Sequence, residues 1–167
     1  MTSTLVAYAS KHGSTEEVAR AIGSYLRDAG HDVDIRDAAA VTDVEPYDCV
    51  VLGGALYMGR WHADARTFLR RHRAALAGRA LAVFALGPLT LEDGQVAGSR
   101  KQLGKALRHL GVHPHFITVF GGVVEPEKLR FPFNHMPKSD ARDWSEIEAW
   151  AGEVALGFRD YVPAETV

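Results

Sequence analysis

The sequence predicts an α/β protein in which a five-stranded parallel sheet lies between two layers of helices. Short apolar runs at residues 5–9, 49–52, 80–86 and 116–120 are too brief for helices, and each is followed by Gly or Ser, as is typical of strands buried on both faces. Helical patterns lie between these runs. Strands that alternate with helices favour a parallel sheet with right-handed crossovers, for which the common strand order is 2-1-3-4-5.

The remaining elements follow the same alternation. Residues 33–35 alternate apolar with charged side chains, so we expect an edge strand there. The connection over residues 36–48 has no full amphipathic helix, and only a short helical turn is expected at residues 38–41. Four helices are predicted from apolar side chains three or four positions apart, at Val18, Ile22, Leu26 and Ala29; Ala65, Phe68, Leu69, His72 and Leu76; Val96, Leu103, Leu107 and Leu110; and Ile147, Trp150, Ala151, Val154 and Phe158. We expect residues 1–167 to form one domain.

Composition excludes several classes of partner. The formal net charge is −2 and the isoelectric point is about 6.4, which gives no general attraction for nucleic acid or anionic lipid. Cys49 is the only cysteine, so no internal disulfide can form, and no signal-peptide pattern is present, which favours a cytoplasmic location. No apolar run approaches the length of a membrane-spanning helix, although peripheral association stays open.

The stretch "ASKHGSTEEVA" joins the first predicted strand to the first predicted helix. It carries three hydroxyls, and Gly13 lets the backbone turn closely. The first amide N–H groups of a helix have no partner within it, and the helix dipole adds about half a positive charge at that end. The loop therefore predicts a phosphate site. Its candidate residues are Ser10, Lys11, His12, Gly13, Ser14 and Thr15.

The same loop also fits an ordinary Ser or Thr helix cap, reinforced by Glu16 and Glu17, which needs no ligand. Two familiar phosphate motifs are absent. A P-loop requires GxxxxGK followed by Ser or Thr, whereas residues 98–105 have one residue too many and are followed by Ala106. The dinucleotide fingerprint GxGxxG does not occur after the first predicted strand, so both motifs are set aside.

The stretch "GGALYMGRWH" follows the predicted strand at residues 49–52 and combines glycines with large apolar side chains. Tyr57 is suited to stacking on a flat aromatic ring, whereas Trp61 is better explained as a contact between the next helix and the core. The stretch "LGPLT" after residues 80–86 is small and apolar, and it could close the far side of a planar ligand, although alone it is an ordinary turn. The candidate ring contacts are Ala55, Leu56, Tyr57, Met58 and Gly59, together with Leu86, Gly87, Pro88 and Leu89.

The Ser-x-x-Gly-Ser-Thr loop, followed by these two loops, resembles the flavodoxins over nearly the whole chain. The resemblance implies a flavodoxin-like three-layer sandwich in which the first loop holds the phosphate of FMN and the other two hold its isoalloxazine ring. The stretches "VVLGGALYMGRWHADARTFLRRH" and "DWSEIEAWA" look more like the flavodoxin-type, menaquinone-dependent protoporphyrinogen oxidases of bacteria. That likeness implies an FMN-dependent oxidoreductase acting on a porphyrinogen or a quinone.

Two departures keep alternatives open. Members of that oxidase family generally carry a longer basic and apolar segment after the fifth strand, whereas here prolines interrupt any long helix. The other class is the flavodoxin-type electron carrier, which is not an enzyme and is usually strongly acidic, unlike this chain. A phosphorylated receiver domain would need an aspartate at the end of the predicted strand over residues 49–52, where Leu52 and Gly53 stand instead. The segment after the fifth predicted strand, at residues 116–120, contains Pro126, Leu129, Phe131, Pro132, Phe133, Met136 and Pro137.

No side chain is predicted as a catalytic acid or base. His62 is better explained as a surface residue at a helix start than as a proton relay. A metal site at His109, His113 and His115 is not expected, because Pro114 and the following strand would point these rings in different directions. Cys49 lies inside an apolar run and is expected to be inert.

Overall fold

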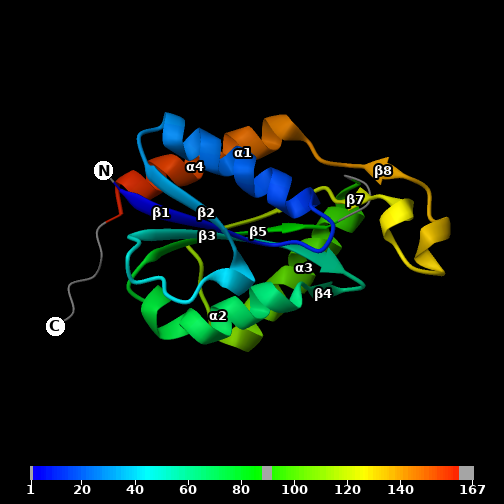
Figure 1. Ribbon diagram of the computed structural model, residues 1–167, viewed down its shortest axis with the longest axis horizontal. Coiled ribbons are helices and arrows are strands. Elements are labelled where there is room, and N and C mark those ends of the chain that lie inside the picture. Colours follow the sequence, from blue (N-terminus) through cyan, green and yellow to red (C-terminus); the bar gives the residue numbers. More distant parts are fainter. Residues whose placement is uncertain (1, 88–91, 162–167) are drawn as a thin grey trace.

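A computed structural model describes residues 2–87 and 92–161 of the chain (Figure 1). Five strands form a parallel sheet in the order β2-β1-β3-β5-β6. A two-residue strand, β4, pairs only with β3, so the parallel strands have the predicted order 2-1-3-4-5. The parallel strands are β1 (Ser3–Ala9), β2 (Asp32–Asp37), β3 (Cys49–Tyr57), β5 (Ala80–Leu86) and β6 (Phe116–Phe120).

Helices cover both faces of this sheet, as predicted: α1 and α4 lie on one side and α2 and α3 on the other (Figure 1). Side chains alternate between the two faces along each strand. Val51 and Phe84 therefore pack under α1 and α4, whereas Val50 and Leu52 pack under α2 and α3. The helices are α1 (Ser14–Asp28), α2 (Ala63–Leu76), α3 (Asp93–Leu110) and α4 (Trp144–Arg159).

Each helix begins a few residues before its first predicted apolar position, because its first residues do not belong to the apolar pattern. At α4, for example, the Asp143 carboxylate caps the helix by accepting hydrogen bonds from the N–H groups of Ser145 and Glu146, at 3.0 and 3.4 Å. The short turn predicted after β2 is the 3₁₀ helix η1 (Ala38–Ala40). Among the described residues, no helix is both long enough and apolar enough to cross a membrane.

One expected loop is wrong. The strand predicted at residues 49–52 continues through Gly53 and Gly54 to Tyr57, and β4 (Arg60–Trp61) then returns antiparallel to it. The two glycines belong to the strand because side chains fill the space where their Cβ atoms would be. The Phe84 ring occupies that space at Gly53, and the Trp61 indole nitrogen lies 2.8 Å from the Cβ position of Gly54. Ala55, Leu56 and Tyr57 therefore lie on a strand that extends past the end of β1.

The segment between β6 and α4 contains no long helix among its described residues, as expected because prolines interrupt it. It consists of the hairpin strands β7 (Val123–Val124) and β8 (Ser139–Asp140), with the 3₁₀ helices η2 (Pro126–Lys128) and η3 (Phe133–His135) between them. It starts at Gly121, whose missing side chain leaves room for the backbone of Ala141. We call residues 121–143 the strap; it extends beyond the strands at the right of Figure 1.

Candidate functional site

The strands that lead into the three loops singled out in the sequence end at one edge of the sheet. The strand register aligns Ala9 of β1 with Gly54 of β3, and Ala55 of β3 with Leu86 of β5. The carboxyl ends of these strands are therefore neighbours. Ligands of open parallel α/β sheets bind at this edge, near the point where the strand order reverses.

The loop after β1 leads into α1 through a glycine instead of a capping hydroxyl. Gly13 is the N-cap residue, with φ 95° and ψ −11°, and no side chain of the described structure caps the helix. Ser10 stabilises the turn by accepting a hydrogen bond from the Gly13 N–H at 2.9 Å. In the described structure, therefore, no Ser or Thr side chain caps α1 as the alternative interpretation would require. The amide N–H groups of the first turn keep their capacity to bind an anion.

Thr15, in the first turn of α1, is the most informative polar side chain of this loop. It is 1% exposed, and its Oγ1 has no hydrogen-bond partner within the described structure. A buried hydroxyl without a partner costs roughly 1–3 kcal/mol of stability. A bound anion that reached this hydroxyl would supply the partner.

Basic groups surround the same loop. Lys128 of the strap donates a hydrogen bond from Nζ to the carbonyl oxygen of His12 at 3.2 Å, and it also forms an ion pair with Glu125. Burial, followed by the nearby charges of Lys11 and Lys128, lowers the pKa of His12. The loop therefore has positive charge beside it even when His12 is neutral.

Arg142 connects the strap to α1, a role that the sequence analysis missed. Its guanidinium donates to the carbonyl oxygen of Ser14 at 3.4 Å and to Glu17 at 3.2 Å, and it pairs with Asp140 at 2.8 Å. The side chain is 9% exposed. The hydrogen bond to Asp140 is the main cause of the raised pKa of Arg142. Arg142 and Ser14 are far apart in the sequence, so no local pattern could have indicated the contact.

The second loop presents large apolar side chains to solvent at the same edge of the sheet. Tyr57 is 54% exposed and Met58 is 70% exposed. The tight turn between β3 and β4 has positive φ at both Met58 (50°) and Gly59 (77°). Phe133 of the strap lies against Tyr57, with ring centroids 5.8 Å apart and planes inclined at 67°, a neighbour that the sequence analysis did not predict.

The third loop begins at Gly87, which lies close to the second. The N–H of Gly87 donates to the carbonyl oxygen of Phe120 at 2.9 Å. A Cβ at Gly87 would lie 3.1 Å from Leu56 and 2.9 Å from the Ser99 hydroxyl, so this glycine allows close packing. Leu86 is buried at the end of β5. The other two candidates, Pro88 and Leu89, lie outside the described residues.

Trp61, His62 and Cys49, to which the sequence analysis gave structural roles, occupy structural positions. Trp61 is 2% exposed, and its indole N–H donates to the carbonyl oxygen of Gly54 at 2.9 Å. His62 caps α2 by accepting a hydrogen bond from the Asp64 N–H at 3.1 Å. Cys49 is fully buried, and burial raises the pKa of its thiol to about 12. Within the described ranges, no group of three His, Cys, Asp or Glu side chains could hold a metal ion.

A family profile described as "Flavodoxin domain" matches residues 5–136 of this chain. "Protoporphyrinogen IX dehydrogenase [quinone]" of Escherichia coli K12 is 22% identical over 170 residues, a match that spans 91% of this chain and 94% of that protein. This similarity is distant, but it covers nearly the full length of both proteins.

Solved structures share the fold. A flavodoxin variant from Pseudomonas aeruginosa matches with a TM-score of 0.61 at 19% identity, over 94% of this chain and 99% of that one. Rubredoxin oxygen:oxidoreductase from Desulfovibrio gigas matches with a TM-score of 0.62 at 14% identity, over 95% of this chain but only 36% of that one. At these identities the likeness establishes the flavodoxin-like architecture.

Proposed function

The chain belongs to the flavodoxin domain family, and we propose that it is an FMN-binding oxidoreductase that exchanges electrons with a porphyrinogen or a quinone. The loop after β1 would hold the FMN phosphate, and the loops after β3 and β5 would hold the ring. Activity on a porphyrinogen is supported by the distant similarity to the dehydrogenase of Escherichia coli.

The main support for this proposal is that hydrogen-bonding groups at the N-terminus of α1 lack partners in the described structure. Thr15 buries a hydroxyl without a partner in the described structure, and the N-cap position before it has no capping side chain. A phosphate group would accept hydrogen bonds from both the first-turn amides and this hydroxyl. The family and the polar chemistry of the loop therefore support the same ligand.

When bound, FMN would supply the redox chemistry. The protein's own residues would bind and orient the cofactor. Ser10, Gly13, Ser14 and Thr15 would surround the phosphate, with Lys11, His12 and the strap's Lys128 adding positive charge nearby. Ala55, Leu56, Tyr57, Met58 and Gly59 would face the ring from one side, and Leu86, Gly87, Pro88 and Leu89 from the other.

Thr15 offers a direct test, because Val has nearly the shape of Thr without the hydroxyl. We expect Thr15→Val to weaken FMN binding about tenfold, the loss of about 1.4 kcal/mol that a hydrogen bond to a charged group can supply. Thr15→Ser keeps the hydroxyl and is the matched control. Binding is measured by titrating the protein with FMN and following the change in flavin fluorescence and absorbance. Equal FMN affinity of the wild type and Thr15→Val, or no saturable binding to the folded wild type, would refute the phosphate assignment.

A second candidate function is electron carriage without catalysis. It is favoured by the absence of an evident catalytic acid or base among the described residues near the ring loops, and by the flavodoxins among the structural matches. Turnover separates the two candidates. An oxidoreductase would convert many equivalents of protoporphyrinogen IX in the presence of a quinone, whereas a carrier would exchange electrons only one-for-one with a protein partner.

A further inference from the structure

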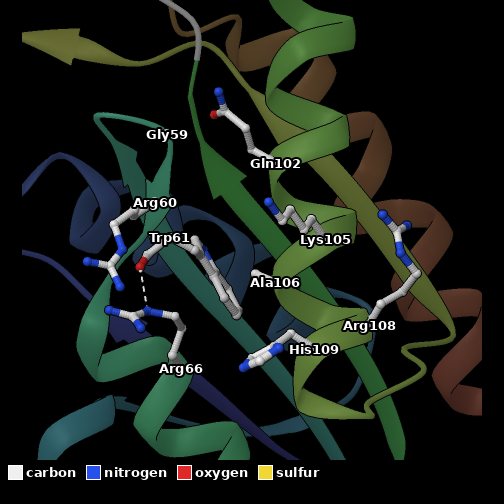
Figure 2. Close-up of a pocket in the computed structure, with 9 residues that line it drawn as sticks. All are labelled: Gly59, Arg60, Trp61, Arg66, Gln102, Lys105, Ala106, Arg108 and His109. Atoms are coloured by element: carbon white, nitrogen blue, oxygen red, sulfur yellow. Dashed lines mark hydrogen bonds between the residues drawn. The ribbon is translucent and has the colours of Figure 1, made fainter.

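A cavity of about 690 Å³ opens beside the turn between β3 and β4 (Figure 2). It lies between β4, α2 and α3, and Gly59 of the candidate ring loop forms part of its wall. Its volume falls within the roughly 300–1,000 Å³ that is typical of small-molecule sites. The cavity therefore adjoins the proposed flavin site and is large enough for part of a substrate.

The lining of this cavity is strongly basic. It includes Arg60, Arg66, Lys105 and Arg108, together with His109, and contains no Asp or Glu. Across the described residues, none of these five side chains forms an ion pair. The whole chain has a formal net charge of −2, so this concentration of positive charge is a local feature. A concave surface lined by one sign of charge attracts ligands of the opposite sign.

The arrangement of the side chains narrows the chemistry of the ligand. In Figure 2, Arg60 and Arg66 extend from β4 and α2, and Lys105 extends toward Trp61 from the facing helix, whereas Arg108 points away from them. Arg66 is held in place by a hydrogen bond from Nε to the Trp61 carbonyl oxygen at 3.0 Å. Guanidinium groups pair with carboxylates through two parallel hydrogen bonds, so two arginines and a lysine suit more than one carboxylate.

We propose that this basic pocket binds the carboxylate groups of the substrate of the flavin site, and that the substrate is an apolar ring system bearing at least two carboxylates. This inference rests on the proposed function. Tyr57 and Met58, 54% and 70% exposed beside the pocket, provide the apolar surface for the ring system. Protoporphyrinogen IX, with two propionate groups on an apolar macrocycle, has this chemistry.

The test measures direct binding of protoporphyrin IX, the oxidised and stable form, by its fluorescence. Its dimethyl ester has the same macrocycle without the charges, and both probes are titrated in the same mild detergent. We expect the diacid to bind at least tenfold more tightly than the ester at low salt, and this difference to shrink as salt rises. Equal affinities for the diacid and the ester would overturn the proposal.

Variants assign the effect to the pocket. We expect Arg60→Gln and Lys105→Gln each to weaken diacid binding roughly fivefold and to leave ester binding unchanged. Lys101→Gln is the matched control, because Lys101 is an exposed lysine on α3 outside the pocket lining. Wild-type diacid affinity in both pocket variants, or an equal loss in the control, would contradict the assignment.

The same variants keep this inference separable from the proposed function. Each is also titrated with FMN, and we expect wild-type affinity because none of the three residues belongs to the candidate flavin site. If the wild type binds FMN and the pocket variants bind the diacid normally, only the carboxylate pocket fails. If the folded wild type binds no FMN, the proposed function fails, whatever the porphyrin titration gives.

Discussion

Substituting alanine at Gly13 separates cofactor binding from fold stability, because the chain contains a matched position. Gly13 precedes α1 and Gly30 follows it, and both have φ of 95°. A Cβ atom at either position would meet nothing within 4 Å. Alanine at either site would therefore introduce backbone strain without a steric clash.

The strain sets the expected magnitude. Holding a non-glycine residue at positive φ costs roughly 1–2 kcal/mol. We expect Gly30→Ala to lower the free energy of unfolding by about this amount, which for a chain of this size is a fall of about 2–4 °C in Tm per kcal/mol. Gly13→Ala should lower it by less, because the loop before α1 relaxes to negative φ when no ligand is bound. Their effects on FMN should differ. FMN must then restore the strained form, so the strain that is absent from the ligand-free protein weakens FMN binding, by about 5- to 30-fold for full relaxation.

The assay combines a thermal melt without ligand with an FMN titration of each variant. The reasoning predicts a smaller fall in Tm in Gly13→Ala than in Gly30→Ala, and a loss of FMN affinity only in Gly13→Ala. Wild-type FMN affinity in Gly13→Ala despite that smaller fall in Tm would show that the conformation at this position does not matter for the cofactor. An equal loss of affinity in Gly30→Ala would show that the effect is a general consequence of lower stability.

Two further predictions concern stability alone. Gly53→Ala should lower the free energy of unfolding by about 1–3 kcal/mol in urea titrations because its Cβ would overlap the Phe84 ring, whereas Gly78→Ala, with nothing within 4 Å of its Cβ position, should unfold like the wild type. Burial lowers the pKa of His72 below its unfolded value near 6.5, so the unfolded chain binds the proton more readily and stability is lost as pH falls from about 6.5 through the folded pKa. His72→Leu should therefore lose less stability than the wild type between pH 7.5 and pH 5 in urea titrations, and parallel pH curves for the two proteins would contradict this.

The strands were predictable where burial on both faces makes a run continuously apolar. The boundaries of β5 and β6 match the predicted runs at residues 80–86 and 116–120. The length of β3 was underestimated because Gly53 and Gly54 are typical of the start of a loop. Their role in the strand depends on the aromatic rings that pack over them, and a local pattern does not contain that information.

The candidate site was predictable only in part, for the same reason. The loop after β1 has a local signature in its hydroxyls and glycine, and the carboxyl ends of parallel strands must share one edge. The strap contacts of Arg142 and Phe133 and the basic pocket depend on residues that are distant in the sequence. Arg60 and Lys105, for example, become neighbours only when α3 packs beside β4.

The position of β1, between β2 and β3, has a consequence for synthesis of the chain. β1 leaves the ribosome before the other strands of this sheet, and it pairs on one side with β2, which follows soon after. Its other side pairs with residues 49–54 and stays open until they have emerged. β5 and then β6 add outward in the order in which they are translated. After β2 has paired, the nascent sheet therefore grows in one direction, and until β6 has emerged its newest strand is an open edge that a chaperone would have to shield.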